Sequence, residues 1–190
     1  MKLDRRSLIL LLLQLAIVST IAAKYLYQRQ TCPRVWVRAV AYDPELVLRG
    51  RYLSMQLHID ACGVTFPPLF TAKGWEASSN VVFDDHGMAL PTIEARIGTA
   101  NGNLVVTALN PDHSRFGFGD HSISLRKGAA CQDATLLDGI SFYIQEHARS
   151  PFPLKPGSYL WVEVTVPPKG PPRPLNLALN DHGHWKPLSF

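Results

Sequence analysis

The chain has 190 residues, of which 46% are hydrophobic and only 18% are charged; this composition excludes a disordered protein and suits one folded domain with an appendage. Fifteen prolines and thirteen glycines argue against long helices in most of the chain, because both residue types are unfavourable inside a helix. The formal net charge is +4, but the basic residues are scattered and form no dense stripe, which argues against a nucleic-acid partner.

The N-terminal segment has the composition of a membrane-spanning helix. Residues 7–23 carry no charge and are rich in Leu and Ile. Tyr25 and Tyr27 can extend this helix into the membrane interface, where aromatic rings are favoured, so that residues 7–27 are long enough to span a bilayer. We therefore expect a single transmembrane anchor at 7–27.

A cleaved signal peptide is the alternative interpretation of the same segment. Cleavage requires small residues three positions and one position before the cut, and the best available pair, Thr20 with Ala22, matches poorly. We expect the helix to be retained, which predicts a cytoplasmic arm at 1–6, the anchor, a linker at 28–33 and an extracytoplasmic domain at 34–190. The basic residues on both sides of the helix do not decide its orientation.

All three cysteines, Cys32, Cys62 and Cys131, follow the predicted helix. Cys62 and Cys131 could form a disulfide, which would place the domain in an oxidising compartment such as the periplasm. Three buried free thiols are the alternative, and the sequence leaves both open.

Two segments show most clearly the two-residue alternation of half-buried β-strands, and we expect them to carry the core. Their aliphatic faces consist of Leu53, Met55, Leu57 and Ile59 in the first strand and of Leu160, Val162, Val164 and Val166 in the second. Their opposite faces carry Tyr52, Ser54, Gln56 and His58, and Tyr159, Trp161, Glu163 and Thr165.

Further strands are expected at 34–41, 92–97, 104–109, 123–126 and 140–145. Asn101-Gly102 is a strong hairpin signal between two of them, because both residues tolerate positive φ. About eight strands in one domain predict a mainly β fold, either a β-sandwich or a partly open β-barrel.

The two core strands begin alike, which suggests an internal duplication. The residues that open them are Gly50, Tyr52 and Leu53 in the first and Gly157, Tyr159 and Leu160 in the second. Each strand is followed by a Pro-Pro step, a glycine-containing loop and an apolar run that ends in Asp-His-Gly. We therefore expect two copies, at about 49–90 and 156–188, related by a pseudo-twofold axis, and we assign the six opening residues a structural role.

Residues 42–55 read Tyr-Asp-Pro-Glu-Leu-Val-Leu-Arg-Gly-Arg-Tyr-Leu-Ser-Met and follow the Leu-rich N-terminal helix. Together with Ser-Phe-Tyr-Ile-Gln-Glu at 141–146, they resemble the GDYXXLXY-domain proteins, small membrane-anchored proteins of bacteria. Arg51 replaces the family's usual acidic residue, and Gln56-Leu57 stands where its motif leads to an aromatic one. The resemblance implies an uncleaved helix in the inner membrane and a domain facing the periplasm; it implies no reaction, because the family has no assigned activity.

Asp-His pairs occur in the sequence more often than random placement predicts, which makes them candidates for a metal site or for acid–base chemistry. Four of the seven histidines directly follow an aspartate: His86, His113, His121 and His182. Neighbours on a strand point to opposite faces, so such a pair ligates one metal ion only in a turn. Gly follows two of the pairs, which favours a turn role. His182 and His184 could chelate a metal, but no third ligand has a diagnostic spacing. We therefore expect no metal, no cofactor and no catalytic residue.

The leading functional hypothesis is a non-enzymatic accessory protein that presents its β domain to a neighbouring integral membrane protein. It follows from the anchor, from the lack of a reactive constellation in the sequence and from the duplicated strand unit. One alternative is a small metal-dependent hydrolase that uses the Asp-His pairs. Another is an envelope module that binds a ligand of unspecified kind through Tyr52, Tyr159 and Trp161, since exposed aromatic rings commonly serve as binding surfaces.

Overall fold

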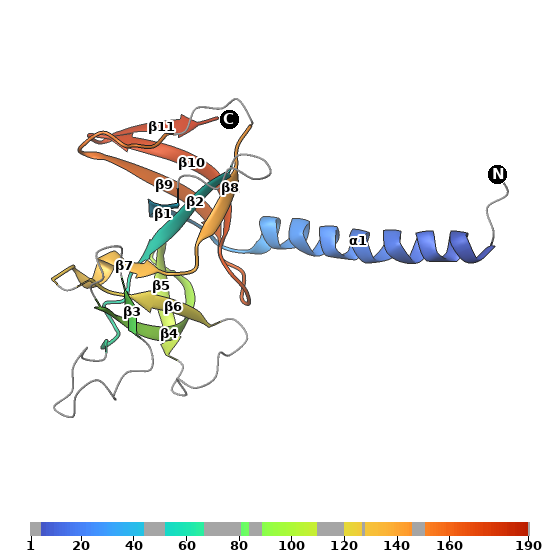
Figure 1. Ribbon diagram of the computed structural model, residues 1–190, viewed down its shortest axis with the longest axis horizontal. Helices are drawn as coiled ribbons and strands as arrows, with labels where there is room; N and C mark the ends of the chain where they lie inside the picture. The colour runs from blue at the N-terminus through green and yellow to red at the C-terminus, as the bar shows by residue number, and fades with distance from the viewer. Residues whose placement is uncertain are drawn as a thin grey trace. The chain divides into compact units, whose positions relative to one another are not determined.

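The structure is a computed structural model that describes residues 5–43, 52–66, 81–83, 89–109, 120–126, 128–145 and 151–189. The chain divides into two compact units, Met1–Cys32 and Pro33–Phe190. The first unit contains an apolar α-helix and the second is built of strands (Figure 1). The described part of the chain is therefore mainly β with a single N-terminal apolar helix, as predicted.

Helix α1 (Arg5–Thr31) is 27 residues long, which corresponds to about 40 Å. Among the described residues it is the one helix long and apolar enough to cross a membrane, a property that a signal sequence would share. It continues beyond residue 27, where the Thr31 hydroxyl donates to the Tyr27 carbonyl (2.8 Å). The linker expected at 28–33 is therefore mostly helical, because no Pro or Gly ends the helix before Pro33.

The second unit is an antiparallel sheet. Its strands are β1 (Arg34–Asp43), β2 (Tyr52–Ile59), β3 (Val81–Phe83), β4 (Ala89–Ala100), β5 (Asn103–Leu109), β6 (His121–Ser124), β7 (Ala134–Leu136), β8 (Ile140–Tyr143), β9 (Ser158–Thr165), β10 (Arg173–Asp181) and β11 (His184–Leu188). Hydrogen bonding gives the order β11-β10-β9-β1-β2-β7-β6-β4-β3, with β5 paired to β4 and β8 paired to β2. Strand β1 thus lies between β9 and β2, although these three are far apart in the sequence.

The sheet is open and does not close into a barrel, but it bends back on itself. Asp60, just after β2, bridges to β5: its N–H donates to the Leu104 carbonyl (2.9 Å) and its carbonyl accepts from the Val106 N–H (3.0 Å). In the sheet order, β7, β6 and β4 separate β2 from β5. This bend lets strands from both ends of the sheet contribute to one core.

The core contains the aliphatic residues that the alternation predicts for β2 and β9. All eight are at most 6% exposed: Leu53, Met55, Leu57, Ile59, Leu160, Val162, Val164 and Val166. Thr165, expected on the outer face of β9, is also buried. At this position β9 is paired with a strand on each side. Arg34 of β1 and Arg173 of β10 lie opposite Thr165, and these neighbouring strands cover a side chain that alternation alone would leave exposed.

The hairpin predicted at Asn101-Gly102 is present between β4 and β5. Its two turn residues have φ values of 51° and 77°, the left-handed conformation that Asn and Gly adopt most easily. The register around the turn, Ala100 opposite Asn103, is that of a two-residue loop.

The two stretches expected to be copies of a duplication do not form equivalent units. β2 and β9 both pair antiparallel with β1, so they run in the same direction, whereas a twofold axis perpendicular to the sheet would reverse one of them. The strands that follow also differ: β10 pairs with β9, but β3 pairs with β4. The prediction of a pseudo-twofold repeat is therefore wrong. Short motifs of Gly, Tyr and Pro specify local turns, but they do not specify which strands pair. Gly50 lies outside the described residues.

Candidate functional site

The outer face of the sheet around β1 and β9 gathers aromatic and charged side chains. Directly paired residues of neighbouring strands place their side chains on the same face, so Arg38, Trp161 and Ala178 form one row across β1, β9 and β10. Trp36 lies two residues before Arg38 and shares its face, while the intervening Val37 is buried in the core. The alternation that fills the core therefore also creates this outer surface.

Three of the four tryptophans of the chain meet on this face. Trp185 of β11 lies between the other two, with its ring centroid 5.7 Å from that of Trp36 and 5.2 Å from that of Trp161. Trp36 is 37% exposed and Trp185 is 50% exposed. We call this group the tryptophan cluster; aromatic side chains that remain exposed together are unusual outside binding surfaces.

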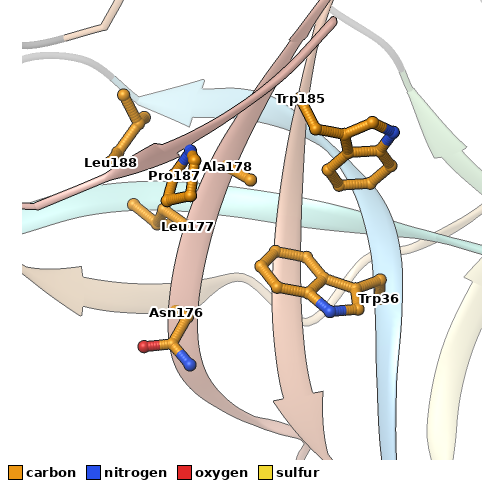
Figure 2. A pocket seen from close by; sticks show the side chains of 7 residues that line it. All are labelled: Trp36, Asn176, Leu177, Ala178, Trp185, Pro187 and Leu188. Carbon is orange, nitrogen blue, oxygen red and sulfur yellow. The ribbon is translucent and has the colours of Figure 1, made fainter. Parts of the chain in front are cut away.

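An apolar hollow of about 520 Å³ lies beside the cluster. In Figure 2, Trp36 and Trp185 stand on one side of it and Leu177, Pro187 and Leu188 on the other. Ala178 and Asn176 complete the lining. Its volume falls in the range of roughly 300 to 1,000 Å³ that is usual for ligand pockets, and its walls offer contact area and few hydrogen bonds.

A second, polar hollow of about 270 Å³ shares Trp36 with the first. Its lining comes from β1, β2, β5, β9 and the short turn at Cys131–Asp133, and consists of Trp36, Val37, Arg38, His58, Asp60, Asn103, Leu104, Gln132, Asp133 and Trp161. Across it, Nη2 of Arg38 donates to Oδ1 of Asp133 at 2.6 Å. The two partners are 32% and 43% exposed, so solvent screens this ion pair and its main effect is to fix the position of both groups.

His58 lies inside the polar hollow with its side chain 15% exposed. Its Nδ1 atom is 3.9 Å from Oδ1 of Asp133, too far for a hydrogen bond. Burial lowers the pKa of His58, and the nearby Arg38 guanidinium lowers it further, which outweighs the opposite influence of Asp133. The imidazole is therefore held in its neutral form at neutral pH.

A disulfide bond supports the floor of the polar hollow. Cys62 and Cys131 are bonded, with their Cα atoms 4.7 Å apart, so of the two alternatives left open by the sequence the structure contains the bridge. The Ala61 N–H also donates to the Cys131 carbonyl (3.0 Å). Because Cys131 begins the turn that carries Asp133, these two links fix Asp133 relative to β2. Cys32 is a free thiol.

The three aromatic residues proposed from the sequence as a ligand-binding patch do not form one site. Trp161 lines the polar hollow. Tyr159 is 49% exposed and lies beneath the Arg38 guanidinium, 5.4 Å from the ring centroid. Tyr52 packs instead against Tyr143, with centroids 6.4 Å apart. The strand β1 lies between β9 and β2, which the sequence could not indicate and which separates Tyr52 from the other two.

The remaining motif residues have structural positions. Leu53 and Leu160 are buried in the core. Gly157 precedes β9 with φ of +82°, and a Cβ atom there would lie 2.5 Å from Cε1 of His182. Glycine is favoured here mainly because φ is positive, since the contacted ring atoms belong to His182, whose side chain is 73% exposed and can move.

The histidines of the Asp-His pairs lie apart wherever the structure describes them. His121 is buried in β6 and contacts Asp138 through Nδ1 (2.6 Å). His182, with φ of 49°, and Gly183 form the turn before β11, which confirms the turn interpretation for this pair. His184 is the first residue of β11. His86 and His113 lie outside the described residues, and within them no three His, Cys, Asp or Glu side chains are grouped to hold a metal ion.

Sequence reasoning missed five residues of this face: Trp36, Arg38, His58, Asp133 and Trp185. The alternation of β1 could have identified Trp36 and Arg38, since both stand at outward positions between the inward aliphatic residues of this strand. Nothing in the sequence brings Asp133 or Trp185 to them, because these contacts depend on strand order.

Comparison with known proteins gives no family assignment: no protein-family model, no curated protein and no solved structure matches the chain. The resemblance to GDYXXLXY-domain proteins stays a prediction, and the geometry of the outer face is the basis for the proposals below.

Proposed function

We propose that the protein is a non-enzymatic accessory protein, anchored in the bacterial inner membrane by α1, whose domain faces the periplasm and binds a neighbouring integral membrane protein. The observation that carries the proposal is the apolar hollow beside Trp36 and Trp185, two large side chains that are 37% and 50% exposed on a sheet whose other face fills the core. The apolar hollow is the proposed contact site for the partner.

The disulfide supports the periplasmic location. Bonds such as that between Cys62 and Cys131 persist in oxidising compartments and are rare in the cytosol. The length and apolar character of α1 support the anchor. A retained helix would confine the domain to the membrane, where partners in the same membrane meet it at high effective concentration even if their affinity is modest.

The chemistry of the apolar hollow supports a protein partner. Tryptophan is enriched among the residues that dominate binding energy at protein interfaces, particularly where it borders a pocket that a partner's side chain can fill. The walls supplied by Leu177, Pro187 and Leu188 would accept an apolar side chain and exclude water. The nearby Arg38 guanidinium is paired with Asp133, which suits a surface that holds its shape.

Site-specific photo-crosslinking in native membranes tests this proposal. A benzophenone amino acid would replace Trp185 in the full-length protein, and a matched variant would carry it at Tyr143, which is 78% exposed and lines neither hollow. We expect a discrete crosslinked product with an integral membrane protein from position 185 and none from position 143. Identical products from both positions, or none from either, would contradict the proposed contact site.

A further inference from the structure

Two side chains that line the polar hollow carry buried hydrogen-bonding atoms without a well-placed partner in the part of the chain that the structure describes. Within the described residues no hydrogen bond of good geometry reaches Nδ1 or Nε2 of His58, although the Asp133 backbone lies close enough to raise the pKa of the imidazole. A third buried atom without a partner, Nε1 of Trp161, belongs to a residue that lines the same hollow. Leaving a buried polar atom unpaired costs free energy, of the order of 1 to 3 kcal/mol each. Three such atoms in one hollow indicate a ligand that forms hydrogen bonds with them.

The charges around the hollow indicate a neutral ligand. The guanidinium of Arg38 in the lining is paired with Asp133, and a second guanidinium, on Arg126, lies close enough to lower the pKa of His58. Asp60 adds a second carboxyl group to the lining, and it accepts a hydrogen bond from the N–H of Cys62 (2.9 Å). Since the lowered pKa keeps His58 neutral, two carboxylates and two guanidinium groups balance each other around the hollow, and these surroundings favour a neutral ligand over an anion such as phosphate.

The geometry of the donors and acceptors narrows the ligand class further. The indole Nε1 of Trp161 can only donate, whereas a neutral imidazole has one donor and one acceptor nitrogen. Hydroxyl groups satisfy both kinds, because each can donate and accept. Trp36 also lines the hollow, and the negative π-face of an indole ring can stack against the weakly positive C–H groups of a saturated ring.

We propose that the polar hollow binds a neutral pyranose sugar, with hydroxyls bonded to His58 and Trp161 and one ring face on Trp36. The polar hollow shares Trp36 with the apolar hollow, but its hydrogen-bonding residues His58 and Trp161 do not line the apolar one. The proposal therefore goes beyond the partner contact proposed above. A free sugar, an envelope glycan and a glycolipid headgroup all present this chemistry.

Binding is measured on the full-length protein in a detergent without a sugar headgroup, by following the His58 imidazole signals in NMR spectra. The probes are neutral hexoses and N-acetylhexosamines, their β-linked disaccharides, vesicles that contain a neutral glycolipid, glucuronate and inorganic phosphate. We expect saturable shifts with at least one neutral sugar and none with the two anions. Whether free sugars, disaccharides or glycolipid vesicles bind most tightly identifies the source.

Variants locate the site. His58→Phe and Trp161→Phe retain ring size but remove the unpaired nitrogens, and we expect each to weaken sugar binding about tenfold or more. Tyr143→Phe serves as a control outside both hollows. Leu188→Ala, which removes a wall of the apolar hollow and does not line the polar one, would impair the partner crosslink from position 185 while retaining sugar binding. Failure of the partner proposal is therefore distinguishable from failure of this one.

The proposal is overturned if no neutral probe shifts the His58 signals at concentrations up to roughly 50 mM, well above a millimolar dissociation constant. It is also overturned if glucuronate or phosphate binds in preference, or if the folded His58→Phe and Trp161→Phe proteins bind sugar as wild type does. The wild-type titration needs no variant, so a substitution that impairs folding leaves the test intact.

Discussion

Removal of the Cys62–Cys131 disulfide should destabilise the domain strongly and make the lining of the polar hollow less well ordered. The bond joins residues 69 positions apart, and loop-closure entropy for a loop of this length gives about 4 kcal/mol of stabilisation. That is a large share of the 5 to 15 kcal/mol typical of a folded domain. The loss should also loosen the turn at Cys131–Asp133, and with it the Arg38–Asp133 ion pair.

Urea unfolding of the full-length protein in detergent, followed by tryptophan fluorescence, measures this effect. The variants are Cys62→Ser with Cys131→Ser, and Cys32→Ser as the control for loss of a free thiol. We expect the double variant to lose about 2 to 5 kcal/mol of unfolding free energy and the control to behave as wild type. Equal midpoints for the double variant and wild type, with the bond shown to be formed in the latter, would refute the reasoning.

Three further predictions concern the stability of the domain. Gly157→Ala should lower the unfolding free energy by about 1 to 2 kcal/mol, mainly because φ at this position is +82°. Adding His182→Ala should recover little of this loss, because the exposed His182 ring can move away, and full recovery in the double variant would contradict this. Leu57→Ala should cost about 2 to 5 kcal/mol, because Leu57 is fully buried, whereas exposed Leu109 should tolerate the same change within about 0.5 kcal/mol; similar losses would be the wrong result. Burial raises the pKa of Glu94, so the folded state holds a proton that the unfolded chain has lost, and stability should fall as pH rises through the window from the ordinary glutamate pKa to the raised one. Glu94→Gln should lack that loss in unfolding measured from about pH 4 to 7, and an unchanged pH profile would exclude Glu94 as its source.

The secondary structure and the core were largely predictable, because they depend on local alternation. Leu53 to Ile59 and Leu160 to Val166 face the core as their period of two requires, and Asn101-Gly102 forms the predicted turn. These features need information only from neighbouring residues. The predicted end of the helix, at residue 27, was too early. The apolar run ends near residue 23, but the helix continues to Thr31, because the first residue that lacks a backbone N–H donor is Pro33.

The candidate site was predictable only in part, because it depends on which strands are neighbours. The sequence identified Trp161 and Tyr159 as outward residues, yet it grouped them with Tyr52, which contacts Tyr143 instead. The expected duplication suggested a symmetric arrangement, whereas β1 lies between β9 and β2 and brings Trp36 and Arg38 to Trp161. Short motifs determine turns, and long-range pairing determines the site.

The mass of the intact protein extracted from cell membranes, measured before and after reduction, tests most directly the claim of a retained helix that anchors an oxidised periplasmic domain. We predict the full-length chain, with Cys62 and Cys131 lacking their two thiol hydrogens until a reductant is added. A mature chain that begins after Ala23, or three free thiols in the untreated protein, would contradict the claim.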